Sequence, residues 1–347
     1  MSAFKYAAIG AAFNFLALSR IPALVRRFSK SRGVIFTLHR VLPDKPADFA
    51  PNAILQITPD FLEYTVERVR ELGFDVVTID EAIDRLEATE RGRPFVVFSF
   101  DDAYRDNLQY GLPVLRRAQA PFTLFVSTAL IDGRGEIWWQ AIEDIIAGRD
   151  AIAIPGKNGR DYLPTATHAE KQRAYDTLYA HMRRIPEPER VALMLELSEA
   201  YGLDIHAHCR NLIMDWDELQ SFIAEPLCTI GAHTVHHYEL SKLPEEEARA
   251  EIVGSIQRLA EATGTAPRHF SYPIGSRIAA GPREYALARD LGFRSAVTTL
   301  PGGLYHSDSE HLLSLPRVSL NGLYQARRYV DVFATGGLFS LLGRVDE

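Results

Sequence analysis

Two short stretches of this sequence carry side chains whose types and spacing could do chemistry together. Asp101 and Asp102 follow the apolar run 94–98, and a continuous apolar run is typical of a strand buried on both faces. His233 and His237 lie four residues apart at the end of a second strand-like segment, 227–233, so one helical turn would put both imidazoles on one face. Two imidazoles and one carboxylate form a ligand set that zinc and iron use.

Each stretch also has an ordinary explanation. An aspartate pair after a strand can form a solvated turn or cap a helix, and a polar loop can be rich in histidine by chance. However, the carboxyl ends of parallel strands gather at one end of an α/β barrel, where the loops carry the chemistry. Two such motifs at strand ends are therefore better explained by one metal site. His236 would point elsewhere on a helical turn and is not expected to be a ligand.

The elements that must position these residues alternate between short apolar strands and amphipathic helices, the pattern of an α/β fold. One helix is predicted to start at Thr58, a plausible cap, because Pro59 suits the first helical position. About seven βα units can be counted, which suits a barrel with an irregular closure. The predicted strands are 33–41, 74–79, 94–98, 122–126, 227–233, 269–273, 295–298 and 315–318.

The barrel is predicted to span residues 33–325, with one interruption. From about 136 to 215 the sequence changes to long helical patterns rich in Ala, Leu, Glu and Arg. We interpret this segment as a helical insertion over the barrel rather than as an independent domain. Residues 326–347 are predicted to form a C-terminal tail.

The N-terminal segment 1–32 is predicted to be an amphipathic helical segment. Its apolar stretch, 6–18, is shorter than the roughly 20 residues that a transmembrane helix needs. Most of the basic residues follow the stretch, so a signal peptide, which starts with basic residues, fits poorly. A helix on an anionic membrane surface and a helix packed on the domain fit about equally well, and an uncleaved signal anchor fits less well.

Composition excludes several classes of protein. The chain has 347 residues and a net charge of −7, which argues against nucleic-acid binding because no excess of basic residues is available for phosphates. Its two cysteines, Cys209 and Cys228, form no CxxC motif, so neither a disulfide scaffold nor a thiolate zinc site is expected.

Three motifs together resemble those of the polysaccharide deacetylases, the NodB-homology family. F-S-F-D-D-A at 98–103 matches the signature T/S-F-D-D-G, and H-T-V-H-H at 233–237 matches H-S/T-x-x-H. F-S-Y-P-I-G at 270–275 is similar to the third motif, F-x-Y-P-x-G, in the form typical of relatives acting on bacterial exopolysaccharides. The resemblance covers roughly 33–320 and implies a distorted (β/α)7 barrel with a metal-dependent N-deacetylase site.

The resemblance also implies a role for each motif residue. Asp102, His233 and His237 would hold one divalent metal ion, zinc by preference, with cobalt or nickel as alternatives. Such an ion lowers the pKa of a bound water to about 7 and polarises an amide carbonyl. Asp101 would be the general base that takes the proton of that water.

Further assignments concern the oxyanion and the sugar. The resemblance puts the backbone N–H that meets the oxyanion at Tyr104 or Tyr272. Trp139, like Trp138 and Tyr104, could stack on a sugar ring, although core packing explains such aromatic residues at least as well.

The general acid is assigned to His39. In most of the family the acid is a histidine in a late Leu-x-His motif, which His306 and His311 lack. His39, in L-H-R-V at 38–41, resembles the early histidine that serves as the acid in the permuted exopolysaccharide deacetylases. The competing interpretation is a core histidine bonded to a backbone group.

The sequence departs from the family pattern at two points. Ala103 stands where a glycine usually follows the aspartate pair, which would strain the turn if its φ is positive. The third motif lacks the arginine that normally holds the base. Arg317, in L-P-R-V at 315–318, is the predicted substitute, and its charge would keep Asp101 ionised.

The predicted function is that of a hydrolase of C–N bonds other than peptide bonds, which removes acetyl groups from an N-acetylated carbohydrate. The alternatives are hydrolysis of a non-sugar amide on the same barrel and a non-catalytic carbohydrate-binding barrel. A cytoplasmic or inner-membrane-associated location is favoured over export, with membrane contact through residues 1–32.

Overall fold

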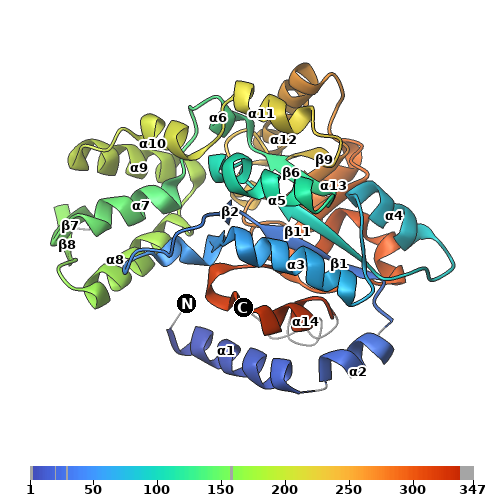
Figure 1. Ribbon diagram of the computed structural model, residues 1–347. Coiled ribbons are helices and arrows are strands. Elements are labelled where there is room, and N and C mark those ends of the chain that lie inside the picture. Colours follow the sequence, from blue (N-terminus) through green and yellow to red (C-terminus); the bar gives the residue numbers. More distant parts are fainter. Residues whose placement is uncertain (1–2, 20, 29, 157–158, 337–347) are drawn as a thin grey trace.

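The computed structural model describes residues 3–336 except 20, 29, 157 and 158, and its core is a closed barrel of seven parallel strands (Figure 1). Pairing runs in the order β1-β12-β11-β10-β9-β6-β5, and β5 pairs again with β1 over its whole length. The strands are β1 (Gly33–Leu38), β5 (Phe95–Phe100), β6 (Phe122–Val126), β9 (Cys228–Ala232), β10 (His269–Ser271), β11 (Ser295–Pro301) and β12 (Leu315–Ser319). The predicted (β/α)7 architecture is thereby confirmed.

The predicted strand at 74–79 is only partly formed. Two residues, β4 (Asp75–Val76), pair with the first residues of β5, and β6 pairs with the last ones. Because β1 takes the other edge of β5, β4 lies outside the closed ring. The chain from Ile79 onward is already helical.

Helices cover the outside of the barrel because each has one apolar face. In α3 (Pro59–Glu71), the Thr58 side chain accepts a hydrogen bond from the Phe61 N–H and Pro59 opens the first turn, as predicted. The others are α4 (Ile79–Glu87), α5 (Leu112–Arg117), α6 (Thr128–Ile131), α11 (Trp216–Ile223), α12 (Glu245–Thr263) and α13 (Pro282–Asp290).

The insertion lies beside the barrel, in green and yellow in Figure 1, and shares its hydrophobic core. It contains α7 (Trp138–Ala147), α8 (His168–Met182), α9 (Glu187–Tyr201) and α10 (Ile205–Leu212). It also contains an antiparallel hairpin of β7 (Ala151–Gly156) and β8 (Gly159–Pro164), which the helical sequence pattern does not predict. The residues of β8 are largely exposed and lack the apolar alternation that announces a strand.

Short elements connect the strands and helices around the barrel. The loop after β1 contains a two-residue ladder of β2 (Arg40–Val41) with β3 (Gln56–Ile57) and the turn η1 (Pro51–Leu55). A single π-helical turn, η2 (Asn107–Gly111), leads into α5. Later turns are η3 (Leu240–Lys242), η4 (His306–Glu310), η5 (Leu312–Ser314), η6 (Gly322–Tyr324), η7 (Arg327–Tyr329) and α14 (Val330–Phe333).

The N-terminal segment forms two helices, α1 (Ala3–Leu18) and α2 (Ile21–Phe28), along one edge of the molecule (Figure 1). Phe13 of α1 is buried, with its ring 4.9, 5.7 and 5.5 Å from the rings of Tyr324, Tyr329 and Phe333. Within the described part of the chain, no helix is both long enough and apolar enough to cross a bilayer. Of the predicted C-terminal tail, residues 337–347 lie outside the described residues.

Candidate metal centre

The aspartate pair lies in a tight turn directly after β5. The Asp101 N–H donates to the Leu38 carbonyl at 3.0 Å, which ties the end of β5 to the end of β1. Asp102 and Ala103 then take positive φ values of 74° and 60°. The Ala103 carbonyl accepts from the Met214 N–H at 3.2 Å, so the end of the insertion holds this turn. A side chain in the left-handed region costs about 1–2 kcal/mol, which is the strain expected where alanine replaces glycine.

The histidine motif forms an irregular loop, so the prediction of a helical turn was wrong. Thr234 and His237 have φ values of 64° and 60°, and the Thr234 hydroxyl accepts from the His237 N–H at 3.0 Å. These two reversals still bring the His233 and His237 imidazoles together, with ring centroids 4.8 Å apart. His236 points away, as predicted: its Nδ1 lies 2.6 Å from Glu251 on α12.

Asp102, His233 and His237 converge on one point and are all buried. One ligand atom of each lies within 4.8 Å of the others. The Nε2 atoms of His233 and His237 are 3.4 and 3.3 Å from the same oxygen, Oδ1 of Asp102. That oxygen has no hydrogen-bond partner among the described residues. A buried carboxylate oxygen without a donor, facing two imidazole nitrogens, fits a bound divalent cation.

Each of the two imidazoles has a feature that favours binding of a cation. The Nδ1 of His233 lies 2.7 Å from the Ser271 carbonyl oxygen, which accepts its proton and leaves Nε2 with a free lone pair. Burial lowers the pKa of His237 to about 4, so its ring is neutral at pH 7. Neutral imidazoles are the form that binds metals.

Asp101 is paired with Arg317 from β12. The two guanidinium nitrogens Nη1 and Nη2 donate to Oδ1 and Oδ2 of Asp101 at 2.8 and 2.7 Å. Arg317 is itself held by the Thr298 carbonyl and by the hydroxyls of Ser99 and Ser271. Burial alone would raise the pKa of Asp101, but the Arg317 charge outweighs it and holds that pKa well below its ordinary value.

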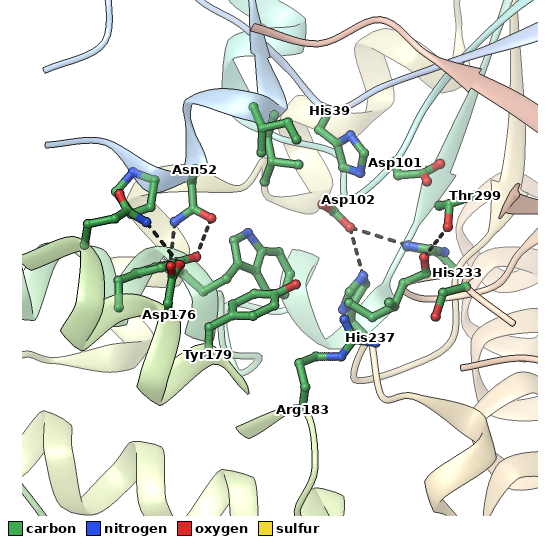
Figure 2. Close-up of a pocket in the computed structure, with 18 residues that line it drawn as sticks. His39, Asn52, Asp101, Asp102, Asp176, Tyr179, Arg183, His233, His237 and Thr299 are labelled. Carbon is green, nitrogen blue, oxygen red and sulfur yellow. Dashed lines mark hydrogen bonds and ion pairs between the residues drawn. The ribbon is translucent and has the colours of Figure 1, made fainter. Parts of the chain in front are cut away.

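His39 extends from the end of β1 into the same pocket, on the side where Asp101 and Asp102 lie (Figure 2). Its backbone is fixed by the residues that follow the aspartate pair. The Asn107 amide donates to the His39 carbonyl at 2.8 Å, and Asp106 accepts from the Val41 N–H at 2.8 Å.

The late histidines lie elsewhere. The His306 Nδ1 is 3.0 Å from the Leu86 carbonyl of α4, and His311 lines a different hollow, beside α13. Of the three candidate acids, only His39 lines the pocket that holds the aspartate pair.

The two tyrosines differ in their relation to the site. The Tyr272 N–H donates to the Val297 carbonyl at 3.2 Å, and the Tyr272 hydroxyl donates to the Leu313 carbonyl at 3.0 Å, so this residue is not available to an oxyanion. Tyr104 directly follows the strained turn, and its buried hydroxyl accepts from Nε1 of Trp139 at 3.0 Å. Tyr104 is therefore the better placed of the two.

A pocket of about 620 Å³ opens over these groups (Figure 2). Trp139 of α7 lines it, with its ring centroid 4.9 Å from that of His237. In Figure 2, Asn52, Asp176 and Tyr179 lie on the wall opposite His39 and Asp101. That wall is built by η1 and by α8 of the insertion, through Pro51, Asn52, Ile54, Leu55, Gln172, Tyr175, Asp176, Tyr179 and Arg183.

Comparison with known protein families gives one match, to the family described as polysaccharide deacetylase, over residues 88–296. The matched segment is more than half of the chain. The protein belongs to the polysaccharide deacetylase family. The match includes Asp101, Asp102, His233 and His237, whereas His39 and Arg317 lie outside it. The family is metal-dependent, in agreement with the buried ligand cluster of this deacetylase.

Solved structures share the fold of the deacetylase. Streptococcus pyogenes deacetylase PplD in complex with acetate is 16% identical, covers 87% of this chain and 97% of its own, and has a TM-score of 0.53. IcaB from Ammonifex degensii is 18% identical, with coverages of 86% and 97% and a TM-score of 0.54. BC0361, a polysaccharide deacetylase from Bacillus cereus, is 14% identical, with coverages of 86% and 68% and a TM-score of 0.51. No curated protein sequence matches the deacetylase.

A network of ion pairs, missed in the sequence, joins the histidine loop to the insertion. Arg183, after α8, donates to Glu239 at 2.6 Å, and Lys242 lies 3.0 Å from Glu239 and 3.2 Å from Glu187 of α9. Glu187 pairs in turn with Arg190, which is 2% exposed. Charged residues on helices normally indicate a face exposed to solvent. Only the tertiary structure therefore reveals that these ion pairs hold the loop that carries His237.

Proposed function

We propose that this deacetylase is a metal-dependent hydrolase that removes acetyl groups from an N-acetylated sugar polymer or oligosaccharide. The observation that carries the proposal is the grouping of an Asp-His-His cluster, an arginine-paired aspartate and a histidine in one pocket. The reaction breaks the amide C–N bond, adds the oxygen of water to the acetyl carbon, and releases acetate and a free amine.

Asp102, His233 and His237 would hold the cation, which when bound supplies Lewis-acid polarisation of the amide carbonyl and a more acidic water. The ligand chemistry is consistent with zinc, cobalt or nickel. Asp101 acts as the general base and takes a proton from the attacking water. Arg317 keeps Asp101 ionised and fixes both of its oxygens, so that the base is charged and oriented at neutral pH.

His39 acts as the general acid. It donates a proton to the amine nitrogen as the C–N bond breaks, which is needed because an amide anion is too poor a leaving group to depart unprotonated. Asn107 and Asp106 hold the His39 carbonyl and the Val41 N–H, so the segment that follows the base also positions the acid.

The remaining roles concern binding. The backbone N–H of Tyr104 donates to the oxyanion that develops on the acetyl oxygen. Trp139 packs against His237 and offers an indole ring to the sugar. A polymeric substrate of the bacterial exopolysaccharide type is favoured by the F-S-Y-P-I-G form of the third motif. A cytoplasmic or inner-membrane-associated location remains a prediction.

The test is acetate release by the purified full chain from an N-acetylated chitooligosaccharide, with a cyclic amide as the competing substrate. Activity on the sugar that is lost on chelation and regained with zinc, cobalt or nickel supports the proposal. The variant His233→Ala should neither retain the metal nor release acetate. Hydrolysis of the cyclic amide alone, or full activity of His233→Ala, would overturn the proposal.

A further inference from the structure

Helix α1 is mostly apolar, and over residues 9–18 the domain covers one of its faces and leaves another exposed. Ile9, Phe13, Leu16 and Ala17 pack on the core. The opposite stripe, Ala11, Phe15 and Leu18, has the i, i+4, i+7 spacing of one helical face and is exposed. Phe15 is 67% exposed and Leu18 is 81% exposed. Because α1 is apolar on its exposed face as well as on its packed face, the exposed face is expected to be covered by protein or lipid.

Helix α2 adds a further exposed apolar side chain. Leu24 is 53% exposed, and α1 and α2 lie end to end along the outer edge of the molecule, against α14 (Figure 1). Outside this edge and among the described residues, the strongly exposed large apolar side chains lie on separate elements: Tyr162, Leu195, Ile278 and Leu323. Scattered apolar residues are normal on a surface, whereas a contiguous stripe indicates a partner.

The same segment is strongly basic within an acidic protein. The first acidic residue of the chain is Asp44, while residues 1–32 contain six basic ones. The chain as a whole carries −7. Arg32 is buried and donates to carbonyls at the end of α4, but Arg20, Arg26, Arg27 and Lys30 flank or belong to α2. A positive charge of this density attracts an anionic surface.

We propose that α1 and α2 form a docking surface for a bilayer that contains anionic phospholipids. Phe15, Leu18 and Leu24 would enter the boundary between headgroups and acyl chains, and the net positive charge of segment 1–32 would attract the lipid phosphates. Stable attachment of a peripheral protein needs two such signals, and this segment has both. A second copy of the chain is the weaker occupant because it would bring an equally positive surface against the first.

Only the turn η6 separates the docking surface from η1, which forms part of the pocket wall. Phe13 of α1 packs on Tyr324 of η6, and Gly322 of the same turn lies against η1. A Cβ at Gly322 would come within 2.0 Å of the Ala53 carbonyl oxygen, so only glycine permits this contact. Ile54 and Leu55 of η1 line the pocket. Docking would therefore hold the pocket near the membrane, whatever reaction the site performs.

The experiment is flotation of the purified full chain with vesicles of phosphatidylcholine, with and without phosphatidylglycerol. We expect binding to the anionic vesicles that weakens as salt is added. The double variant Phe15→Ser and Leu18→Ser should bind at least about tenfold more weakly. Its matched control is Tyr162→Ser with Leu195→Ser, two exposed apolar side chains of the insertion, and this control should bind like the wild type.

A second pair of variants separates charge from apolar contact. Arg26→Gln with Arg27→Gln should lower binding to anionic vesicles by roughly fivefold per residue and leave binding to neutral ones unchanged. The control is Arg173→Gln with Arg249→Gln, two exposed arginines of α8 and α12. Equal thermal unfolding of all variants excludes loss of the fold. Lack of vesicle binding by the wild type, equal weakening by test and control pairs, or a concentration-dependent dimer abolished by Phe15→Ser and Leu18→Ser would overturn the proposal.

Discussion

Replacing Arg317 by methionine should destabilise the deacetylase far more than breaking an exposed ion pair of the same geometry. Arg317 is 1% exposed and pairs with a buried carboxylate through two hydrogen bonds. Arg68 of α3 makes an equally bidentate contact with Asp331, at 2.8 and 2.9 Å, but the two side chains are 30% and 26% exposed. Arg68→Met is therefore the matched control, because it differs mainly in burial.

The magnitude follows from what each variant leaves behind. Removing one partner of a buried ion pair costs about 3–5 kcal/mol, because the remaining charge is uncompensated. The Thr298 carbonyl also loses its donor, which adds about 1 kcal/mol, while the buried methionine side chain recovers part of the loss. We expect Arg317→Met to lower the free energy of unfolding by about 4 kcal/mol, against about 1 kcal/mol or less for Arg68→Met.

The loss of stability caused by Arg317→Met should depend on pH, and the direction of this dependence follows from the pKa of Asp101. In the wild type the pKa of Asp101 lies below its ordinary value, so its contribution to stability is present above about pH 4 and lost as the pH falls. In Arg317→Met, the charge that most strongly opposes burial is gone, so burial raises the pKa of Asp101 relative to the wild type and a proton can relieve the uncompensated charge. The difference between wild type and variant should therefore shrink as the pH falls from 7 toward 4.

The assay is urea unfolding followed by circular dichroism, at several pH values and with a chelator present so that no cation contributes charge. The slope of the unfolding curve checks that each variant still unfolds in one step. The reasoning fails if Arg317→Met loses no more stability than Arg68→Met. It also fails if the loss is the same at pH 4 and pH 7.

Three further predictions concern activity and the cation. His39→Gln should lower kcat about 10²–10⁴-fold with little change in KM, measured by acetate release, because glutamine cannot protonate the leaving amine. Zinc at a hundredfold excess over its Kd should stabilise the wild type by about 2.7 kcal/mol, measured by thermal unfolding, and His233→Ala should not respond. Trp139→Phe keeps a ring on His237 but loses the donor to Tyr104, and should raise KM more than it lowers kcat in the same acetate assay.

The sequence was most informative where one motif lies at one strand end. Asp101 and Asp102 directly follow a buried strand, so their position at the carboxyl end of the barrel follows from the local pattern. The convergence of His233 and His237 was also predictable from their spacing. The conformation of the loop between them was not predictable. Two residues with positive φ, Thr234 and His237, bring the two imidazoles together as effectively as a helical turn would.

Residues that meet only through tertiary structure were harder to predict. Arg317 was proposed because the third motif lacks an arginine, and β12 brings its guanidinium to Asp101 across 216 residues. For the insertion, by contrast, the sequence predicts only that helices cover the barrel. Tyr175 and Tyr179 repeat at helical spacing, which indicates core packing as readily as a binding wall, and only the fold reveals that both line the pocket.

Closure of the barrel has a consequence for how the enzyme is made. β1 pairs with both β5 and β12, so the ring is complete only when the first and last strands meet. A chain still on the ribosome that ends before β12 would already contain every proposed cation ligand, but Asp101 would lack its counter-charge. The enzyme would then become active only after β12 has joined the barrel. The rate at which activity appears during synthesis or refolding would therefore report the rate of barrel closure, which is slow because it pairs strands far apart in the sequence.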